Sequence, residues 1–230
     1  MVDETRSSHI SAIAALDEPT RRRLYEFVAR QAAPVSRDEA ADAVSAPRNT
    51  VAFHLDKLAA EGLLEVVYQR RTGRSGPGAG RPSKLYRRSP DHITVSLPER
   101  RYELAARLMA DSFHEAETTG EPPSAVLRRR AHELGKEIGQ TSRTDDAMDT
   151  LRDFGFEPRP ADDTDDADDA VVLVNCPFHS LAQRHTDLVC GMNLCLVDGI
   201  LDGLATTGLT ARLAPEPGHC CVRLERDPGS

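Results

Sequence analysis

The chain has no tryptophan, few other aromatic residues and no long apolar run. A membrane-spanning helix needs about 20 consecutive apolar residues, and no stretch of this sequence approaches that length. Residues 1–9, MVDETRSSH, are polar and charged, and the apolar segment of a secretory leader does not follow them. We therefore expect a cytoplasmic protein that makes no contact with a membrane.

Cysteine is absent from residues 1–175, and all five cysteines lie within residues 176–221. Thiols stay reduced in the cytoplasm, so disulfide bonds are not expected there. Clustered cysteines in such a protein are metal ligands, redox sensors or core residues.

Charge is distributed unevenly along the 230 residues. The net charge of −8 by itself argues against nucleic-acid binding. Residues 1–97, however, hold 15 Lys and Arg against 12 Asp and Glu, whereas residues 98–230 hold 14 against 25. DNA phosphates respond to the local patch rather than to the total charge. The sequence thus indicates an acidic body with a basic DNA-contacting part, over a length sufficient for two modest domains.

Residues 36–64 have the pattern of two short helices joined by a tight turn. A Ser-x-x-Glu capping box that begins at Ser36 starts the first helix, and a break at the sequence SAP follows. Val51, Leu55 and Leu58 then recur at helical spacing, which predicts a second helix with one buried face. The opposite face is polar, as expected of a helix that lies in the major groove of DNA.

Residues 66–88, which we call the wing, have the pattern of two strands around a loop rich in Gly, Pro and Ser. The segment carries seven basic residues and no acidic one. A hairpin tip of this composition is suited to follow DNA phosphates. The DNA-contacting residues that we expect from the second helix and the wing are Arg48, Asn49, Thr50, Phe53, His54, Lys57, Arg70, Arg71, Arg74, Arg81 and Lys84.

The helices that flank this region can be placed by the same patterns. Residues 9–31 are predicted to form the first helix, in which Asp17 and Pro19 suggest a cap and a first-turn proline. Residues 102–117 are predicted to be helical, and their apolar residues, among them Leu108 and Phe113, are expected along one side.

The element order predicts an α+β protein with three parts. A winged helix-turn-helix domain is expected at residues 1–92, and a helical linker and dimerisation region at residues 93–142. A small α/β module that contains all the cysteines is expected at residues 143–230, as a sensor domain.

Three cysteines are expected where elements of this last module converge. Cys176 follows a strand, Cys190 lies in a long helical region, and Cys220 begins the final strand. Alternation along that strand puts Cys220 on the apolar face and Cys221 on the other. Cys195 lies about 140° around the helix from Cys190 and is expected in the core, where a free thiol packs as a small hydrophobe. Thiols from distant elements are what a metal or an iron–sulfur cluster requires.

Residues 10–90 resemble the winged-helix domains of the ArsR-like bacterial repressors, through ALDEPTRRRLYEFV, NTVAFHLDKLAAEGLL and GRPSKLYRRS. This resemblance implies a homodimer on double-stranded DNA with a near-palindromic operator. The C-terminal part resembles the sensor domain of the SufR-type iron–sulfur repressors, through NCPF, HTDLVC and HCCVRL. That resemblance implies an iron–sulfur cluster as cofactor, and the metal ligands that we expect are Cys176, Cys190, Cys220 and Cys221.

The fourth ligand and the cofactor have alternatives. The third of the four family cysteines would fall near residues 206–208, where this chain has none. Cys221, Cys195, His219, His185 or an outside molecule would then complete the site. Zinc or a bare thiol redox switch are alternatives to the cluster. A cysteine-dependent enzyme is a remote alternative, because no oxyanion loop is evident and the DNA-contacting pattern would be unexplained. We therefore expect a transcriptional regulator, a repressor rather than an enzyme.

Overall fold

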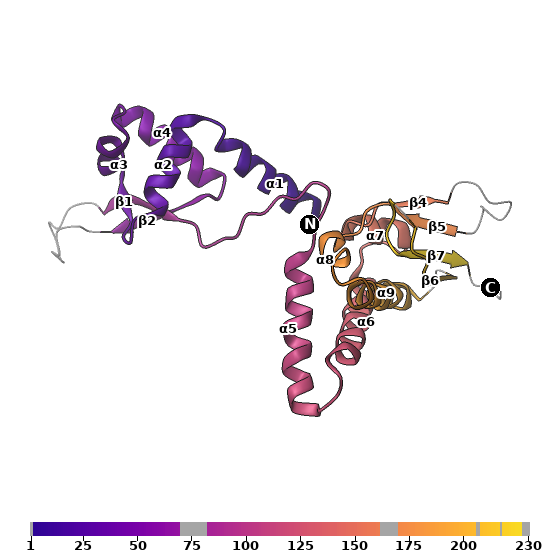
Figure 1. Cartoon of the computed structure of the whole chain (residues 1–230). Coiled ribbons are helices and arrows are strands. Elements are labelled where there is room, and N and C mark those ends of the chain that lie inside the picture. The colour runs from indigo at the N-terminus through magenta and orange to yellow at the C-terminus, as the bar shows by residue number, and fades with distance from the viewer. Residues whose placement is uncertain (1, 70–81, 162–169, 206–207, 217, 227–230) are drawn as a thin grey trace. The chain divides into compact units, whose positions relative to one another are not determined.

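The computed structural model describes all residues except 1, 70–81, 162–169, 206–207, 217 and 227–230 (Figure 1). The chain divides into two compact units, Met1–Val95 and Ser96–Ser230, and each is described by itself. None of the helices in the described ranges has the length and apolar character needed to cross a membrane.

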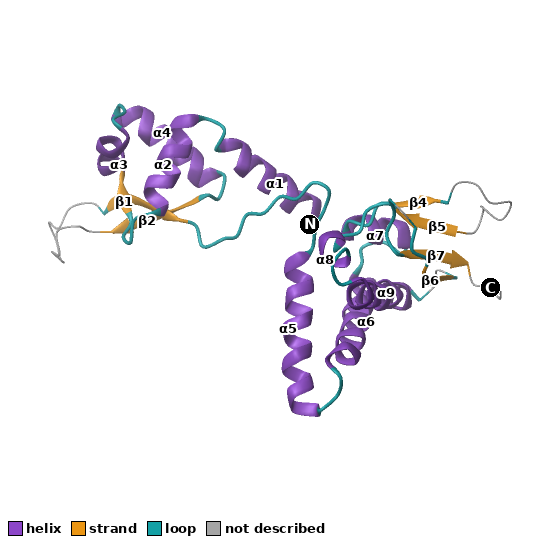
Figure 2. Ribbon diagram, in the orientation of Figure 1, coloured by secondary structure: helices purple, strands orange, loops and turns teal. Residues whose placement is uncertain are grey.

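The first unit combines helices with a three-stranded antiparallel sheet (Figure 2). Its elements are α1 (Val2–Ala15), α2 (Pro19–Ala29), β1 (Val35–Ser36), α3 (Arg37–Val44), α4 (Arg48–Ala60), β2 (Leu64–Gln69) and β3 (Ser83–Arg88). The strand order is β1-β3-β2, so Tyr86 of β3 pairs with Val35 on one side and with Val66 on the other. Strand β1 was not expected from the sequence, because a strand of two residues carries no alternating pattern.

The prediction of a single helix over residues 9–31 was wrong, because two helices, α1 and α2, occupy this region. Glu18, rather than Asp17, caps α2, because its carboxylate accepts hydrogen bonds of 3.0 and 2.6 Å from two amides of the first turn. Pro19 occupies the first turn, as predicted. The cap and the proline prevent α1 from continuing into α2, because the proline has no N–H for a hydrogen bond to residue i−4.

The predicted helix-turn-helix pattern is confirmed at α3 and α4. The amide of Glu39 donates to Ser36 Oγ (3.3 Å) and the amide of Ser36 donates to the Glu39 carboxylate (2.9 Å), which completes the capping box. Ser45 ends α3 in the left-handed conformation, with φ of 54°. Val51 and Leu55 of α4 are fully buried, so this helix is fixed to the core of the unit by the predicted face.

The second unit packs helices with a four-stranded antiparallel sheet of order β4-β5-β7-β6. Its elements are α5 (Tyr102–Thr119), α6 (Pro123–Thr141), α7 (Ala147–Phe154), β4 (Pro158–Pro160), β5 (Ala170–Leu173), α8 (His179–Ala182), α9 (Thr186–Leu204), β6 (Leu209–Leu213) and β7 (Val222–Arg226). The sequence did not suggest β4, because its two prolines are depleted in strands and are tolerated at an edge, where β4 lies. The α+β fold class is as predicted.

Helices α6 and α9 approach closely through glycines. A Cβ atom built on Gly135 of α6 would overlap the carbonyl oxygen of Leu196, and one built on Gly199 of α9 would overlap that of His132. Only glycine allows two helix backbones to come so near. Residues 96–142, most of the segment predicted as a helical linker, therefore belong to the second unit, and their part in dimerisation stays a prediction.

Leu108 and Phe113 do not lie on the same side of α5, contrary to the expectation from the sequence. Ala105, Leu108, Ser112 and Ala116 are buried, whereas Phe113 is 61% exposed. The buried residues follow each other at i+3 and i+4, so they form one stripe. The stripe consists mainly of small residues, which the apolar pattern of the sequence did not single out.

Candidate functional site

The outer face of α4 is the first part of the candidate site. Asn49, Thr50 and Phe53 are exposed, Phe53 to 64%. Arg48, at the start of the helix, is exposed as well, and its Nε lies 3.2 Å from Asp38 Oδ1. An exposed polar and aromatic face above a buried apolar one is what a helix needs to reach base edges in the major groove.

His54 and Lys57 stand apart from these outward residues. The His54 side chain is only 12% exposed, and its Nδ1 is buried 3.8 Å from Glu18 Oε2. Burial raises the pKa of Glu18, but its hydrogen bonds from two backbone amides outweigh burial and lower that pKa to about 2. Lys57 Nζ lies 2.5 Å from Glu61 Oε1 on its own helix. His54 thus points to the start of α2. Its contact with a base stays a prediction, and its burial argues against that contact.

Asp56, Lys84 and Tyr86 form a cluster that we call the Asp56 clamp, which joins α4 to β3. Asp56 Oδ1 accepts hydrogen bonds from Lys84 Nζ (2.5 Å) and from the Tyr86 hydroxyl (2.7 Å). Burial, together with the hydrogen bond to Asp56, raises the pKa of Tyr86 to about 12, so its hydroxyl stays protonated and donates. Lys84, predicted to contact phosphate, is therefore engaged within the protein, where it fixes the wing strand to the helix.

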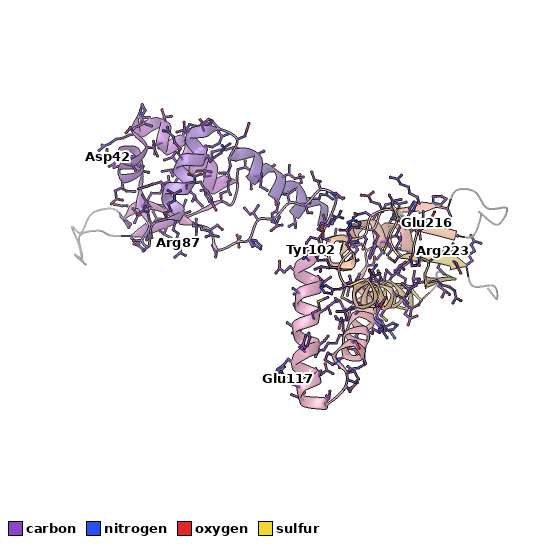
Figure 3. All side chains as sticks on the ribbon, in the orientation of Figure 1. Asp42, Arg87, Tyr102, Glu117, Glu216 and Arg223 are labelled. Carbon is purple, nitrogen blue, oxygen red and sulfur yellow. The ribbon has the colours of Figure 1, made fainter. Side chains whose placement is uncertain are left out.

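The wing is paired along its flanking strands. The register runs from Leu64 opposite Arg88 to Gln69 opposite Ser83, as predicted for a hairpin. Arg87, labelled in Figure 3, pairs across the strands with Glu65 (Nε to Oε2, 2.8 Å). The predicted phosphate contacts that lie outside the described residues are Arg70, Arg71, Arg74 and Arg81.

Four of the five cysteines come together in the second unit, and we call Cys176, Cys190, Cys220 and Cys221 the thiol quartet. Cys176 follows β5, Cys190 lies near the start of α9, and the adjacent pair precedes β7. The thiols of Cys176 and Cys220 are hydrogen-bonded, and so are those of Cys190 and Cys221. Cys190 also interacts electrostatically with Cys176, and Cys220 with Cys221. The two hydrogen-bonded pairs are therefore neighbours. Cys195 is only partly buried and packs against the core.

The thiols of the quartet differ in how readily they ionise. The hydrogen bond with Cys220 lowers the pKa of Cys176, and the same bond and burial raise the pKa of Cys220. Burial, together with Cys221, raises the pKa of Cys190 to about 12. Asn193, which is 1% exposed, donates from Nδ2 to Cys220 Sγ (3.2 Å). Its Oδ1 is buried without a hydrogen-bond partner.

The donor chemistry of the quartet fits a thiolate-bound metal, although the side chains stand as two hydrogen-bonded pairs. Four sulfur atoms suit zinc or an iron–sulfur cluster. Among the residues that the structure describes, no group of three or more His, Cys, Asp or Glu side chains is arranged to hold a metal ion. His219 Nδ1 lies 3.9 Å from Glu216, and His179 is hydrogen-bonded with Gln183 (3.1 Å). Ligation by the quartet stays a prediction.

The comparisons with known proteins bear on the first unit. Residues 16–67 match the family model of a helix-turn-helix domain. The first unit contains a helix-turn-helix domain. The match covers α2, α3 and α4 and extends into β2, and a helix-turn-helix domain suggests a DNA-binding transcriptional regulator. Searches of curated proteins and of solved structures found no match to this chain.

Sequence reasoning missed three residues that shape the site: Glu18, Asn175 and Asn193. Glu18 competes with its neighbour Asp17 as a cap, and only backbone geometry separates the two. Asn193 did carry a signal, because it is a lone amide within the apolar run LVCGMNLCLV and a polar residue in such a run is expected to have a specific partner. Asn175, next to Cys176, is buried and has partners 20 and 75 positions away.

Proposed function

We propose that this protein is a repressor that binds a near-palindromic operator as a homodimer, and that an iron–sulfur cluster held by the thiol quartet controls its affinity for DNA. The observation that carries the proposal is the convergence of four thiols, from the end of β5, from α9 and from the start of β7, in a chain that also has a helix-turn-helix domain. A thiolate-held cluster would crosslink these three elements and so favour one arrangement of the DNA-binding units over another.

On the DNA side, the proposal assigns base contacts to the outer face of α4 and phosphate contacts to the wing. The exposure of Asn49 and Phe53 supports the first assignment, because an amide can pair with adenine and a ring can lie against a thymine methyl group. The absence of acidic residues from residues 66–88 supports the second. A second subunit is needed for two half-sites, as dimeric helix-turn-helix proteins use them.

A thiol redox switch is the second candidate for the quartet, and the pairing of its thiols favours it. Removal of two electrons and two protons from Cys176 and Cys220 by a cellular disulfide would join them, and Cys190 and Cys221 form a second such pair. The hydrogen bond with Cys220 lowers the pKa of Cys176 and so favours its thiolate, which is the form that attacks a disulfide. Zinc in place of the cluster would leave the protein colourless.

The deciding experiment is purification of the full chain without oxygen, followed by absorbance and by iron, sulfide and zinc analysis. Broad absorbance near ~400 nm with matching iron and sulfide is expected for the cluster. Changing any one member of the quartet to Ser is expected to abolish the bound metal, because a site that loses one ligand rarely keeps comparable affinity. Cys195→Ser is the matched control and is expected to retain it. Metal retention in all four quartet variants would refute ligation, and disulfides in place of metal would favour the switch.

The DNA side can be tested with operators selected from a random duplex pool. Replacing Arg71 and Arg74 by Ala is expected to weaken binding to selected and unrelated duplexes alike, and to lower the salt slope by about one for each phosphate that is no longer neutralised. If affinity falls on the selected operator alone, these residues contact bases and the phosphate assignment is wrong.

A further inference from the structure

The segment that follows the first unit in the chain, residues 96–101, ends in contact with the loop that carries Cys176. We call residues 96–101 the connecting segment. We call residues 174–178 the cysteine loop. Arg100 Nη1 donates to Asn175 Oδ1 and to the carbonyl oxygen of Cys176, the latter at 3.2 Å. One guanidinium group of the connecting segment thus holds both the first quartet cysteine and the residue before it.

Asn175 completes the connection from the other side. It is 6% exposed, and its Nδ2 donates to the carbonyl oxygens of Glu99 (3.1 Å) and Gly155 (2.5 Å). Its Oδ1 accepts from Arg100, so all the polar atoms of this amide side chain have partners. A buried amide with every hydrogen bond made cannot turn without losing some of them, which costs about 1–3 kcal/mol for each buried group left unpaired.

Two further contacts continue the same junction into α5. The amide of Arg101 donates to the carbonyl oxygen of Pro177 (3.0 Å). The hydroxyl of Tyr102, labelled in Figure 3, donates to Ser180 Oγ (2.8 Å), just past the cysteine loop. Three successive residues, Arg100 to Tyr102, are therefore hydrogen-bonded to residues 175–180.

This arrangement ties the loop that carries Cys176 to the segment that continues the chain of the first unit. A change at the thiols that shifts the backbone of the cysteine loop must break or carry along the hydrogen bonds of Arg100 and Asn175. The connecting segment is the covalent continuation of the first unit, which ends at Val95. Coupling between sites requires an element whose arrangement both sites bias. The connecting segment is the candidate, because it is bonded to the cysteine loop at one end and continues the chain of the first unit at the other.

We infer that Arg100 and Asn175 are positioning residues that couple the state of the thiol quartet to the DNA-binding unit through the connecting segment. The inference rests on the proposed function, since it concerns how that regulation is transmitted. Neither residue is a proposed ligand or DNA contact.

The test measures DNA affinity of the full chain on its selected operator, with the cluster reconstituted and with it removed by chelator. The ratio of the two dissociation constants is the coupling, about 5–150-fold in typical allosteric proteins. Arg100→Met keeps the aliphatic stem but removes the donors, and its ratio is expected to fall to within about twofold of one, while its cluster absorbance stays at the wild-type level. Arg100→Lys, which retains the charge and a donor, is expected to recover part of the ratio. Arg107→Met, at an exposed position of α5, is the matched control and keeps the wild-type ratio.

Each outcome decides the inference. A wild-type ratio in Arg100→Met with intact cluster overturns the coupling role and leaves the proposed function standing. A wild-type protein with cluster but a ratio of one overturns both. Hydrogen exchange on the wild type provides a reading that needs no variant, because the amide of Arg101 bonds to Pro177. Its exchange rate is expected to change when the cluster is removed, and an unchanged rate counts against the inference.

Discussion

The Asp56 clamp gives a prediction whose size can be worked from the structure. Asp56→Ala removes the acceptor of two hydrogen bonds that tie α4 to β3. The side chains of Lys84 and Asp56 are 40% and 53% exposed, so solvent screens this pair and its loss costs only about 0.2–1 kcal/mol. Tyr86 is 3% exposed, and leaving its buried hydroxyl without a partner costs about 1–3 kcal/mol. Destabilisation of the first unit by roughly 1–4 kcal/mol is expected, most of it through Tyr86.

The assay is a double-mutant cycle in urea, followed by circular dichroism and analysed for the transition of the first unit. Asp56→Ala, Tyr86→Phe and the double variant are compared with the wild type. Because the phenol donates directly to the carboxylate, a coupling energy of about 1–2 kcal/mol is expected. Asp42→Ala is the control, since Asp42 is exposed in the last turn of α3 (Figure 3), where an acid is not favoured by the helix dipole. Additive effects of the two clamp substitutions would falsify the hydrogen bond as the source of the stability.

Three further predictions concern specificity, pH and packing. Asn49→Ala is expected to cost about 1–3 kcal/mol on the selected operator and to relax one base position; competition with single-base operator variants measures this, and unchanged specificity would mean that another face of α4 contacts bases. Glu18→Gln is expected to cost about 0.5–2 kcal/mol at neutral pH through the α2 cap. Because the pKa of Glu18 is lowered from 4.5 to about 2 in the folded protein, the wild-type advantage holds above pH 4.5 and disappears as the pH falls toward 2; a urea series across this range checks it, and an advantage that persists at pH 2 contradicts the cap as its cause. Gly135→Ala is expected to destabilise the second unit by about 1–3 kcal/mol or more, since the new methyl group overlaps the Leu196 backbone. Gly191→Ala is the control, because its methyl group would meet the flexible Arg128 side chain. Equal stability of the two variants would disprove the close helix crossing.

Several features of the site follow from local sequence alone. The capping box at Ser36 and the buried face of Val51 and Leu55 depend on residues three or four positions apart, and the structure has both as predicted. The final strand begins at Val222 rather than at Cys220 as expected, although Cys220 is buried and Cys221 only partly so, as the predicted alternation has it. Neighbours in sequence decide these features, because helix caps and strand faces are set by backbone geometry within one turn or one pleat.

Local pattern was wrong about one side of α5 and left the partner of Lys84 unspecified, because packing decides both. Phe113 was expected on the same side of α5 as Leu108, but Leu108 is buried together with Ala105 and Ala116, whereas Phe113 is exposed. Lys84 was expected to be a phosphate contact because it lies in a basic segment, yet Asp56, 28 positions earlier, holds its ammonium group. The composition of a segment does not specify which residues its side chains will contact, because those residues lie on other helices and strands.

The sequence by itself determined that this protein has a helix-turn-helix with a hairpin after it, and that its cysteines are confined to the C-terminal part. Periodicity, caps and composition carry that information, since each is a property of one short stretch. Only the tertiary structure decided which thiols pair, that His54 faces Glu18, and that Arg100 holds Asn175. These contacts join residues 36 to 75 positions apart, except for the 31 positions between Cys190 and Cys221. Their partners are selected by how helices and strands pack, which no local pattern specifies.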